Sequence, residues 1–143
     1  MSGNLEKARK LLTEKTTFAL INGETVCVSE KSGIAPVMEL LAKTPEILNG
    51  ASAADKVTGR AAALLMVYGG VKELYSALIS EAAVSALEEN GVPYFAEREV
   101  ARINNRGAEG LCPMEKAVTG ISDPGEAYGV LRELTKKLSE RRG

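Results

Sequence analysis

Residues 72–100, KELYSALISEAAVSALEENGVPYFAEREV, decide the fold, because they contain a strand, a helix and a second strand in succession. The apolar run in KELYSALIS is typical of a strand that enters the core. Ser80 is a favourable N-cap for the helix that follows, and Gly91 is the usual kind of residue at which a helix ends. Strands joined through a helix lie parallel in one sheet, so this stretch predicts a parallel crossover.

Residues 16–30, TTFALINGETVCVSE, predict a β-hairpin ahead of that unit. Asn22-Gly23 separates two β-rich runs and favours a type I′ turn, which needs positive φ at both central residues. Cys27 is expected on the second strand as a small buried hydrophobe. Because a hairpin is antiparallel, the whole sheet is predicted to be mixed.

Helices are predicted to cover both faces of this sheet. The segment ADKVTGRAAALLMVYGG, residues 54–70, is interpreted as one helix that is nearly apolar after Arg60 and must therefore be buried. The last helix has Asp123 as its cap and Pro124 as its first residue. Further helices are expected at 5–12, 36–43 and 113–120. The fold class is α/β, a three-layer sandwich with a mixed sheet, and residues 1–143 are interpreted as a single domain.

The composition excludes several kinds of catalytic site. The chain has no histidine, so Ser–His and Cys–His nucleophile pairs and imidazole zinc sites are excluded. Cys27 and Cys112 are the two cysteines, and no structural disulfide is expected in a reducing compartment. We expect neither a metal nor a cofactor.

Charge and hydropathy argue against two classes of partner. The net charge is −1, with acids and bases interspersed, so no global field attracts nucleic acid or anionic lipid. No apolar run approaches the roughly 20 residues of a membrane span, and the N-terminal stretch has no signal-peptide core. We therefore expect a cytoplasmic location.

Cys112 is the candidate nucleophile. Pro113 suits the first position of a helix, which makes Cys112 the N-cap and Glu115 the third residue. The helix dipole would stabilise a thiolate there, and Glu115 could act as the base that histidine cannot be. The alternative is a buried structural thiol with Glu115 completing a local capping box.

The loop before Cys112 contains Asn104, Asn105 and Arg106. Their amide and guanidinium groups suit a planar polar ligand or a phosphate. The same residue types also form turns for local reasons, because asparagine tolerates positive φ and bonds to its own backbone.

Four motifs together resemble a family of uncharacterised prokaryotic proteins of about this length. They are GASAADKVTGRAAALL (50–65), YGGVKELYSALISE (68–81), INNRGAEGLCPMEKAV (103–118) and GISDPGEAY (120–128). The resemblance implies a cytidine-deaminase-like fold, and it implies no activity, because the family has no established biochemical role.

The wider deaminase superfamily implies where a site should lie. Its enzymes hold zinc with His-x-Glu or Cys-x-Glu at one core helix start and Pro-Cys-x-x-Cys at the next. The corresponding starts here read ADKVTGR (54–60) and SEAAVSA (80–86), and neither contains these ligands, so zinc-dependent deamination is not expected. Free N–H groups at the two starts would still suit phosphate or carboxylate. The residues concerned are Asp55, Lys56, Arg60, Ser80 and Glu81.

Each of these residues also has a structural interpretation. Asp55 and Ser80 could be N-caps, and Lys56 beside Asp55 could be either a structural paired charge or a group tuned for acid–base or anion-binding work. We expect Lys56, Arg106, Cys112 and Glu115 to converge on one pocket.

Two functions are compatible with this pattern. The first is a small-molecule site for a nucleotide-like or anionic ligand, with or without metal-independent catalysis through Cys112, Glu115 and Lys56. The second is a non-catalytic ligand-sensing or self-assembling module, in which the chain forms a homo-oligomer.

Overall fold

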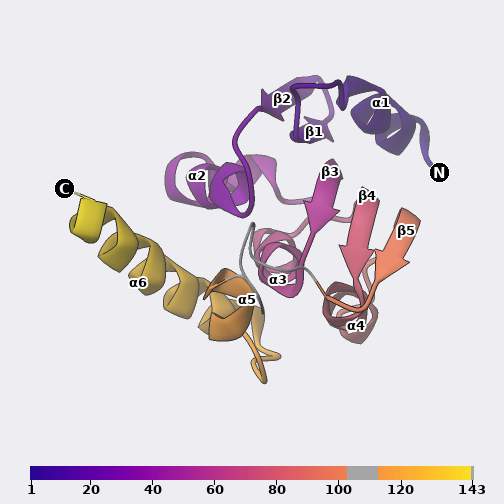
Figure 1. The fold of residues 1–143 in the computed structure, drawn as a ribbon. Helices are drawn as coiled ribbons and strands as arrows, with labels where there is room; N and C mark the ends of the chain where they lie inside the picture. Colours follow the sequence, from indigo (N-terminus) through magenta and orange to yellow (C-terminus); the bar gives the residue numbers. More distant parts are fainter. Residues whose placement is uncertain (103–112, 143) are drawn as a thin grey trace.

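The computed structural model describes residues 1–102 and 113–142, and its centre is a five-stranded sheet in the order β2-β1-β3-β4-β5 (Figure 1). β1 is antiparallel to both of its neighbours, whereas β3, β4 and β5 are parallel. The mixed sheet predicted from the sequence is confirmed. The strands are β1 (Phe18–Asn22), β2 (Thr25–Ser29), β3 (Ser52–Thr58), β4 (Glu73–Ser80) and β5 (Tyr94–Val100).

Helices cover both faces of the sheet and make a three-layer α/β sandwich (Figure 1). α1 (Gly3–Leu11) packs on one face through Leu5 and Ala8. The other face carries α2 (Ala35–Lys43), α3 (Arg60–Gly69) and α4 (Glu81–Glu89). The short 3-10 helix η1 (Pro45–Ile47) follows α2, while α5 (Pro113–Ala117) and α6 (Pro124–Arg142) pack on α3. Among the described residues, no helix is long and apolar enough to cross a membrane.

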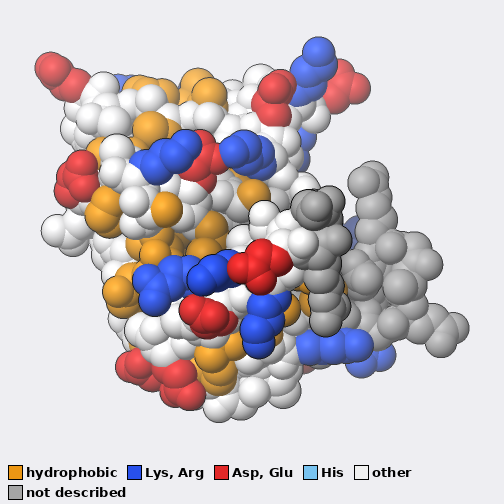
Figure 2. Space-filling model, turned by 90° about the vertical axis from the view of Figure 1, so that its left-hand side faces the viewer, with side chains coloured by type: hydrophobic (Ala, Val, Ile, Leu, Met, Phe, Trp, Pro, Cys, Tyr) orange, Lys and Arg blue, Asp and Glu red, His pale blue; other side chains and the backbone are white. Residues whose placement is uncertain are grey.

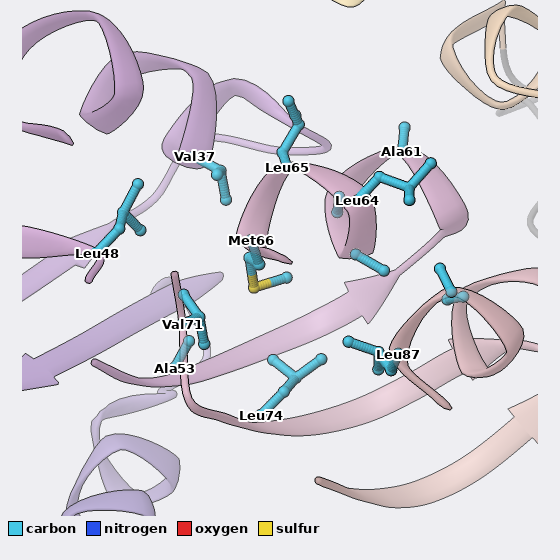
Figure 3. Close-up of a cluster of buried hydrophobic side chains, with 14 of the residues drawn as sticks. Val37, Leu48, Ala53, Ala61, Leu64, Leu65, Met66, Val71, Leu74 and Leu87 are labelled. Atoms are coloured by element: carbon cyan, nitrogen blue, oxygen red, sulfur yellow. The ribbon is translucent and has the colours of Figure 1, made fainter. Parts of the chain in front are cut away.

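The main core lies between α3 and the sheet (Figure 3). Met66 of α3 points toward the strands that carry Ala53 and Leu74, and Val37 of α2 and Leu87 of α4 close the sides. Every residue from 61 to 66 is buried, as expected for a helix that is apolar all round.

The β3 strand corrects the prediction of one long helix over residues 54–70. Ser52–Thr58 form a central strand, and the helix begins only at Arg60. The small and β-branched residues of this segment pack between β1 and β4, where the strand has hydrogen-bonding partners on both sides. Tertiary pairing therefore overrides the helical tendency of its alanines.

The hairpin exists, but its turn is not the one predicted. Asn22 pairs with Thr25, so the two loop residues are Gly23 and Glu24 rather than Asn22 and Gly23. Gly23 has φ +60, which suits the first loop position of a type II′ turn. The Asn22 amide instead donates to the carbonyls of Ile47 and Asn49, both at 2.9 Å.

Cys27 lies on β2, as predicted, but it is half-buried rather than buried. The reason is its position on the outermost strand. It packs against the α2 side of the core, yet in the described part of the chain no further strand lies beyond β2.

Both signs of charge share the side of the molecule that carries α2 and α6. Figure 2 shows Lys and Arg side chains interspersed with Asp and Glu there. On this side, the pattern agrees with the low net charge of the chain.

Replacing Asn22 by alanine should lower the free energy of unfolding by about 1–2 kcal/mol, because two backbone carbonyls lose their donor. Urea denaturation measures the change. Glu24→Ala in the same exposed turn is the control and should change stability by less than about 0.5 kcal/mol. If the two substitutions lowered the free energy of unfolding equally, the hydrogen bonds from Asn22 to the chain after α2 would not stabilise the fold.

Candidate functional site

The predicted site residues within the described chain fall into two groups. Asp55 and Lys56 line a small pocket beside the loop that enters α2, which we call the Asp55 pocket. Arg60, Ser80 and Glu115 line a groove at the carboxyl end of the parallel strands, which we call the edge groove. Asn104, Asn105, Arg106 and Cys112 lie outside the described residues.

The Asp55 pocket has a volume of about 160 Å³ and is bordered by three segments. Thr17 precedes β1, and Asp55, Lys56 and Val57 come from the second half of β3. Lys31, Ser32 and Gly33 form the loop between β2 and α2. The pocket therefore combines one carboxyl group, two amines and two hydroxyls.

Asp55 is the unusual group of this pocket, because this acidic residue is only 6% exposed in the middle of the sheet. Thr58 donates a hydrogen bond to Asp55 Oδ2 at 3.1 Å, and the Thr58 hydroxyl also lies 2.8 Å from Ser76 Oγ. Burial raises the pKa of Asp55 to about 7, although Thr58 and the amides of Val57 and Lys56 pull it down. Asp55 is therefore a buried acid that titrates near neutral pH, and not the N-cap of a helix.

The contact between Asp55 and Thr58 departs from regular strand geometry. In a regular strand, residues three apart point to opposite faces of the sheet. The Thr58 hydroxyl nevertheless bonds to Asp55 and also lies within hydrogen-bond distance of Ser76 on the neighbouring strand. These bonds bring the polar groups of Asp55, Thr58 and Ser76 together inside the sheet.

Two lysines are among the residues that line the pocket. Lys56 Nζ donates to the Glu14 carbonyl at 2.8 Å, in the segment after α1. Lys31 forms an ion pair with Glu39 of α2, with 60% of its side chain exposed. Neither amine is buried, so either one can turn toward a bound anion.

The edge groove has a volume of about 370 Å³ and lies where α3 and α4 begin. Ser80 caps α4 by accepting from the Ala83 amide at 3.1 Å, which confirms its predicted role as an N-cap. Glu81 is exposed in the first turn of the same helix. The lining residues are Arg60, Ser80, Ala82, Ser85, Arg102, Glu115, Thr119 and Gly120.

Glu115 caps α3 from a distant part of the sequence. Its two carboxylate oxygens accept from the amides of Arg60 at 2.7 Å and Ala61 at 2.8 Å. This carboxylate satisfies two free N–H groups and complements the helix dipole. The capping box that would pair Glu115 with Cys112 lies partly outside the described residues and stays a prediction.

Arg60 joins α3 to the chain before α6 and to α4. Its Nε and Nη2 atoms donate to the Ile121 carbonyl at 3.1 and 2.7 Å, and its Nη1 donates to the Ala82 carbonyl at 3.0 Å. Glu89 lies 3.9 Å from Nη2. The guanidinium group of Arg60 therefore uses these N–H groups for hydrogen bonds within the protein.

The structure does not bring Lys56 and Glu115 into contact. Lys56 bonds to the segment after α1, on one side of the sheet, whereas Glu115 bonds to α3 on the other side. Within the described residues, no group of three or more Cys, Asp or Glu side chains is placed to hold a metal ion.

Sequence reasoning missed Lys31, Thr17, Thr58 and Ser76. Lys31 could have been found from the sequence, because KSG (31–33) lies in the loop just before a helix that has proline as its second residue. The hydroxyl pair of Thr58 and Ser76 depends on the strand register and has no signal in the sequence.

Comparison with known proteins identifies the family. Residues 7–135 match the sequence profile described as TM1506, a domain of unknown function, DUF1893. The chain belongs to the DUF1893 family. This confirms the resemblance to an uncharacterised family, while the cytidine-deaminase-like fold remains a prediction.

A solved structure of another protein shares the fold of this DUF1893 chain. It is the crystal structure of the DUF1893 family protein TM1506 from Thermotoga maritima, with a TM-score of 0.81 and 24% sequence identity. The similarity covers 93% of this chain and 91% of that chain. No curated protein matches the DUF1893 chain.

Glu115→Ala should lower the free energy of unfolding by about 2 kcal/mol, because α3 loses a charged cap. Gly59→Ala should act through the same contact, since a Cβ there would lie 2.5 Å from Glu115 Oε1. In the Glu115→Ala background, Gly59→Ala should therefore be much less harmful than in the wild type. Urea denaturation of the four proteins measures the coupling, with Lys116→Ala as an exposed control. If the losses in stability of the two single variants simply added in the double variant, positions 59 and 115 would not be coupled.

Asp55→Asn should change how stability depends on pH. Between about pH 4 and 7, folded Asp55 keeps a proton that the unfolded chain has released, so this group makes stability fall as pH rises. The asparagine variant lacks this contribution and should exceed the wild type by up to about 4 kcal/mol at pH 8, with little gain at pH 4. Urea denaturation across this range gives the difference, with Glu24→Gln as the exposed control. If the wild type and the asparagine variant differed in stability by the same amount at every pH, Asp55 would not be a group with a raised pKa.

Proposed function

We propose that this DUF1893 protein binds a small anionic ligand in the Asp55 pocket. Lys31 and Lys56 supply positive charge at its mouth, and Thr17 and Ser32 supply hydroxyl groups. A volume of about 160 Å³ suits a phosphate, sulfate or carboxylate group. A nucleotide-like ligand would place only its phosphate there, because sites for whole drug-sized molecules are roughly 300 Å³ or more.

Asp55 is the observation that carries this proposal. A carboxyl group held out of water with hydroxyl neighbours lowers stability at neutral pH, and such groups are concentrated at functional sites. In its neutral form, Asp55 can donate a hydrogen bond to an oxygen of the anion. In its ionised form it repels the same anion.

The proposal concerns binding and names no reaction. Catalysis through Cys112, with Glu115 and Lys56 as its partners, remains a prediction. Glu115 and Lys56 contact different segments, and the two oxygens of Glu115 accept from the start of α3. A ligand-sensing role is compatible with a pocket of this kind.

Sulfate is the best probe, because its charge does not change between pH 6 and pH 8. We expect sulfate to raise the melting temperature at pH 6 and to bind at least about tenfold more weakly at pH 8, where Asp55 is ionised. Isothermal titration calorimetry measures the affinity. A nucleoside 5′-monophosphate, measured in parallel at both pH values, tests whether a larger ligand can be accommodated.

Three variants decide whether the Asp55 pocket is the site. Lys56→Gln should weaken sulfate binding about tenfold, and Asp55→Asn should remove its pH dependence. Lys136→Gln removes an exposed lysine from α6 and should leave the affinity unchanged. If Lys56→Gln binds sulfate as tightly as the wild type does, the anion lies elsewhere and the proposal fails.

A further inference from the structure

The two edges of the sheet differ in how they are protected. β5 forms one edge and carries Glu97, Arg98 and Glu99, which are exposed charges of the kind that prevents edge-to-edge pairing. β2 forms the other edge, and its sequence TVCVS contains no charge and no proline. Within the described residues, no strand pairs with the outer side of β2, so this edge can accept another strand.

The register of the hairpin shows which backbone groups face outward. Asn22 and Thr25 flank the two-residue loop and form a hydrogen-bonded pair, and such pairs alternate along an antiparallel ladder. Thr25, Cys27 and Ser29 thus direct their backbone groups toward β1. Val26 and Val28 direct their N–H and C=O groups toward the free edge.

The side chains of β2 are also unusual for an exposed edge. Val26 and Val28 are each 56% exposed and lie on the face that α1 covers over β1 and β3, beyond the reach of α1 itself. On the opposite face, Cys27 borders a groove of about 350 Å³ between β2 and α2. Apolar side chains are therefore present on both faces of this edge.

We propose that β2 pairs antiparallel with β2 of a second copy of this chain, around a two-fold axis at Cys27. In this register Val26 lies opposite the partner's Val28, and Val28 lies opposite the partner's Val26. Both pairs exchange backbone hydrogen bonds, which makes four bonds between the copies. The two sheets join into one continuous sheet, with four valines in contact on one face.

A second copy fits this edge because the strand is complementary to itself. Five residues pair with the same five residues, outward backbone groups meet outward backbone groups, and each valine faces a valine. This is the isologous arrangement that a two-fold dimer requires. Glu24 lies opposite the partner's Glu30 just beyond the paired strands, so salt should strengthen the dimer by screening their repulsion.

Sedimentation velocity over a hundredfold dilution series tests the dimer. The wild type should show a dimer fraction that falls on dilution and rises with salt. Val26→Lys and Val28→Lys should each abolish the dimer while circular dichroism shows an unchanged fold. Phe95→Lys, which alters an exposed apolar residue on β5, is the matched control and should leave the dimer intact.

Cys27 gives an independent readout, because it faces its own counterpart across the axis. Opposite residues in a pair without backbone hydrogen bonds have Cα atoms about 4.5 Å apart, within the range of a disulfide. In the Cys112→Ser background, diamide should link the two Cys27 thiols, which lose two protons and two electrons, the electrons passing to diamide. Cys27→Ser should remove the covalent dimer, and Val28→Lys should greatly slow its formation.

Three results would overturn the proposal. They are a monomeric wild type at every concentration, a dimer that survives Val26→Lys and Val28→Lys, and a dimer that Phe95→Lys abolishes. Neither assay involves the Asp55 pocket, so failure of the dimer and failure of anion binding are distinguishable.

Discussion

Every side of α3 must be kept from water, and the arrangement of the other elements follows from this requirement. Residues 61–66 are buried without exception, so α3 needs partners around its whole circumference. The sheet covers one side of α3, α2 and α4 lie beside it, and α6 packs on the side that faces away from the sheet. Tyr68 extends this outer contact by stacking on Tyr128 of α6, with ring centroids 4.9 Å apart.

The first amide groups of α3 are satisfied by a polar side chain from a distant part of the sequence. Glu115 supplies the acceptors, and Arg60 ties the same turn to the carbonyls of Ala82 and Ile121. The anion-binding capacity of this helix start is consequently filled by the protein's own carboxylate. The Asp55 pocket differs, because its amines are exposed and its carboxyl group is the buried partner.

Much of the fold could be predicted, because periodicity and capping are local properties. The strand–helix–strand unit, Ser80 as a cap and the start of α6 at Pro124 followed from residues within one or two turns of each other. The segment 52–58 could not be assigned in this way, since its alanines suit a helix and only the pairing with β1 and β4 makes it a strand. For the candidate site, the residue types at Asp55 and Lys56 indicated polar function, but the burial of Asp55 follows from the central position of β3 between β1 and β4, which depends on tertiary pairing. Likewise, the amides that Glu115 caps lie more than fifty residues away.

The contact between Gly59 and Glu115 also restricts how the sequence of this family can change over time. A side chain at position 59 and a carboxylate at position 115 would occupy the same space. A lineage that acquires alanine at position 59 must therefore shorten or move the residue at 115 and find another acceptor for the start of α3. The two positions should covary among relatives, and a glycine at 59 should accompany an acidic residue at 115 wherever α5 keeps its place against α3.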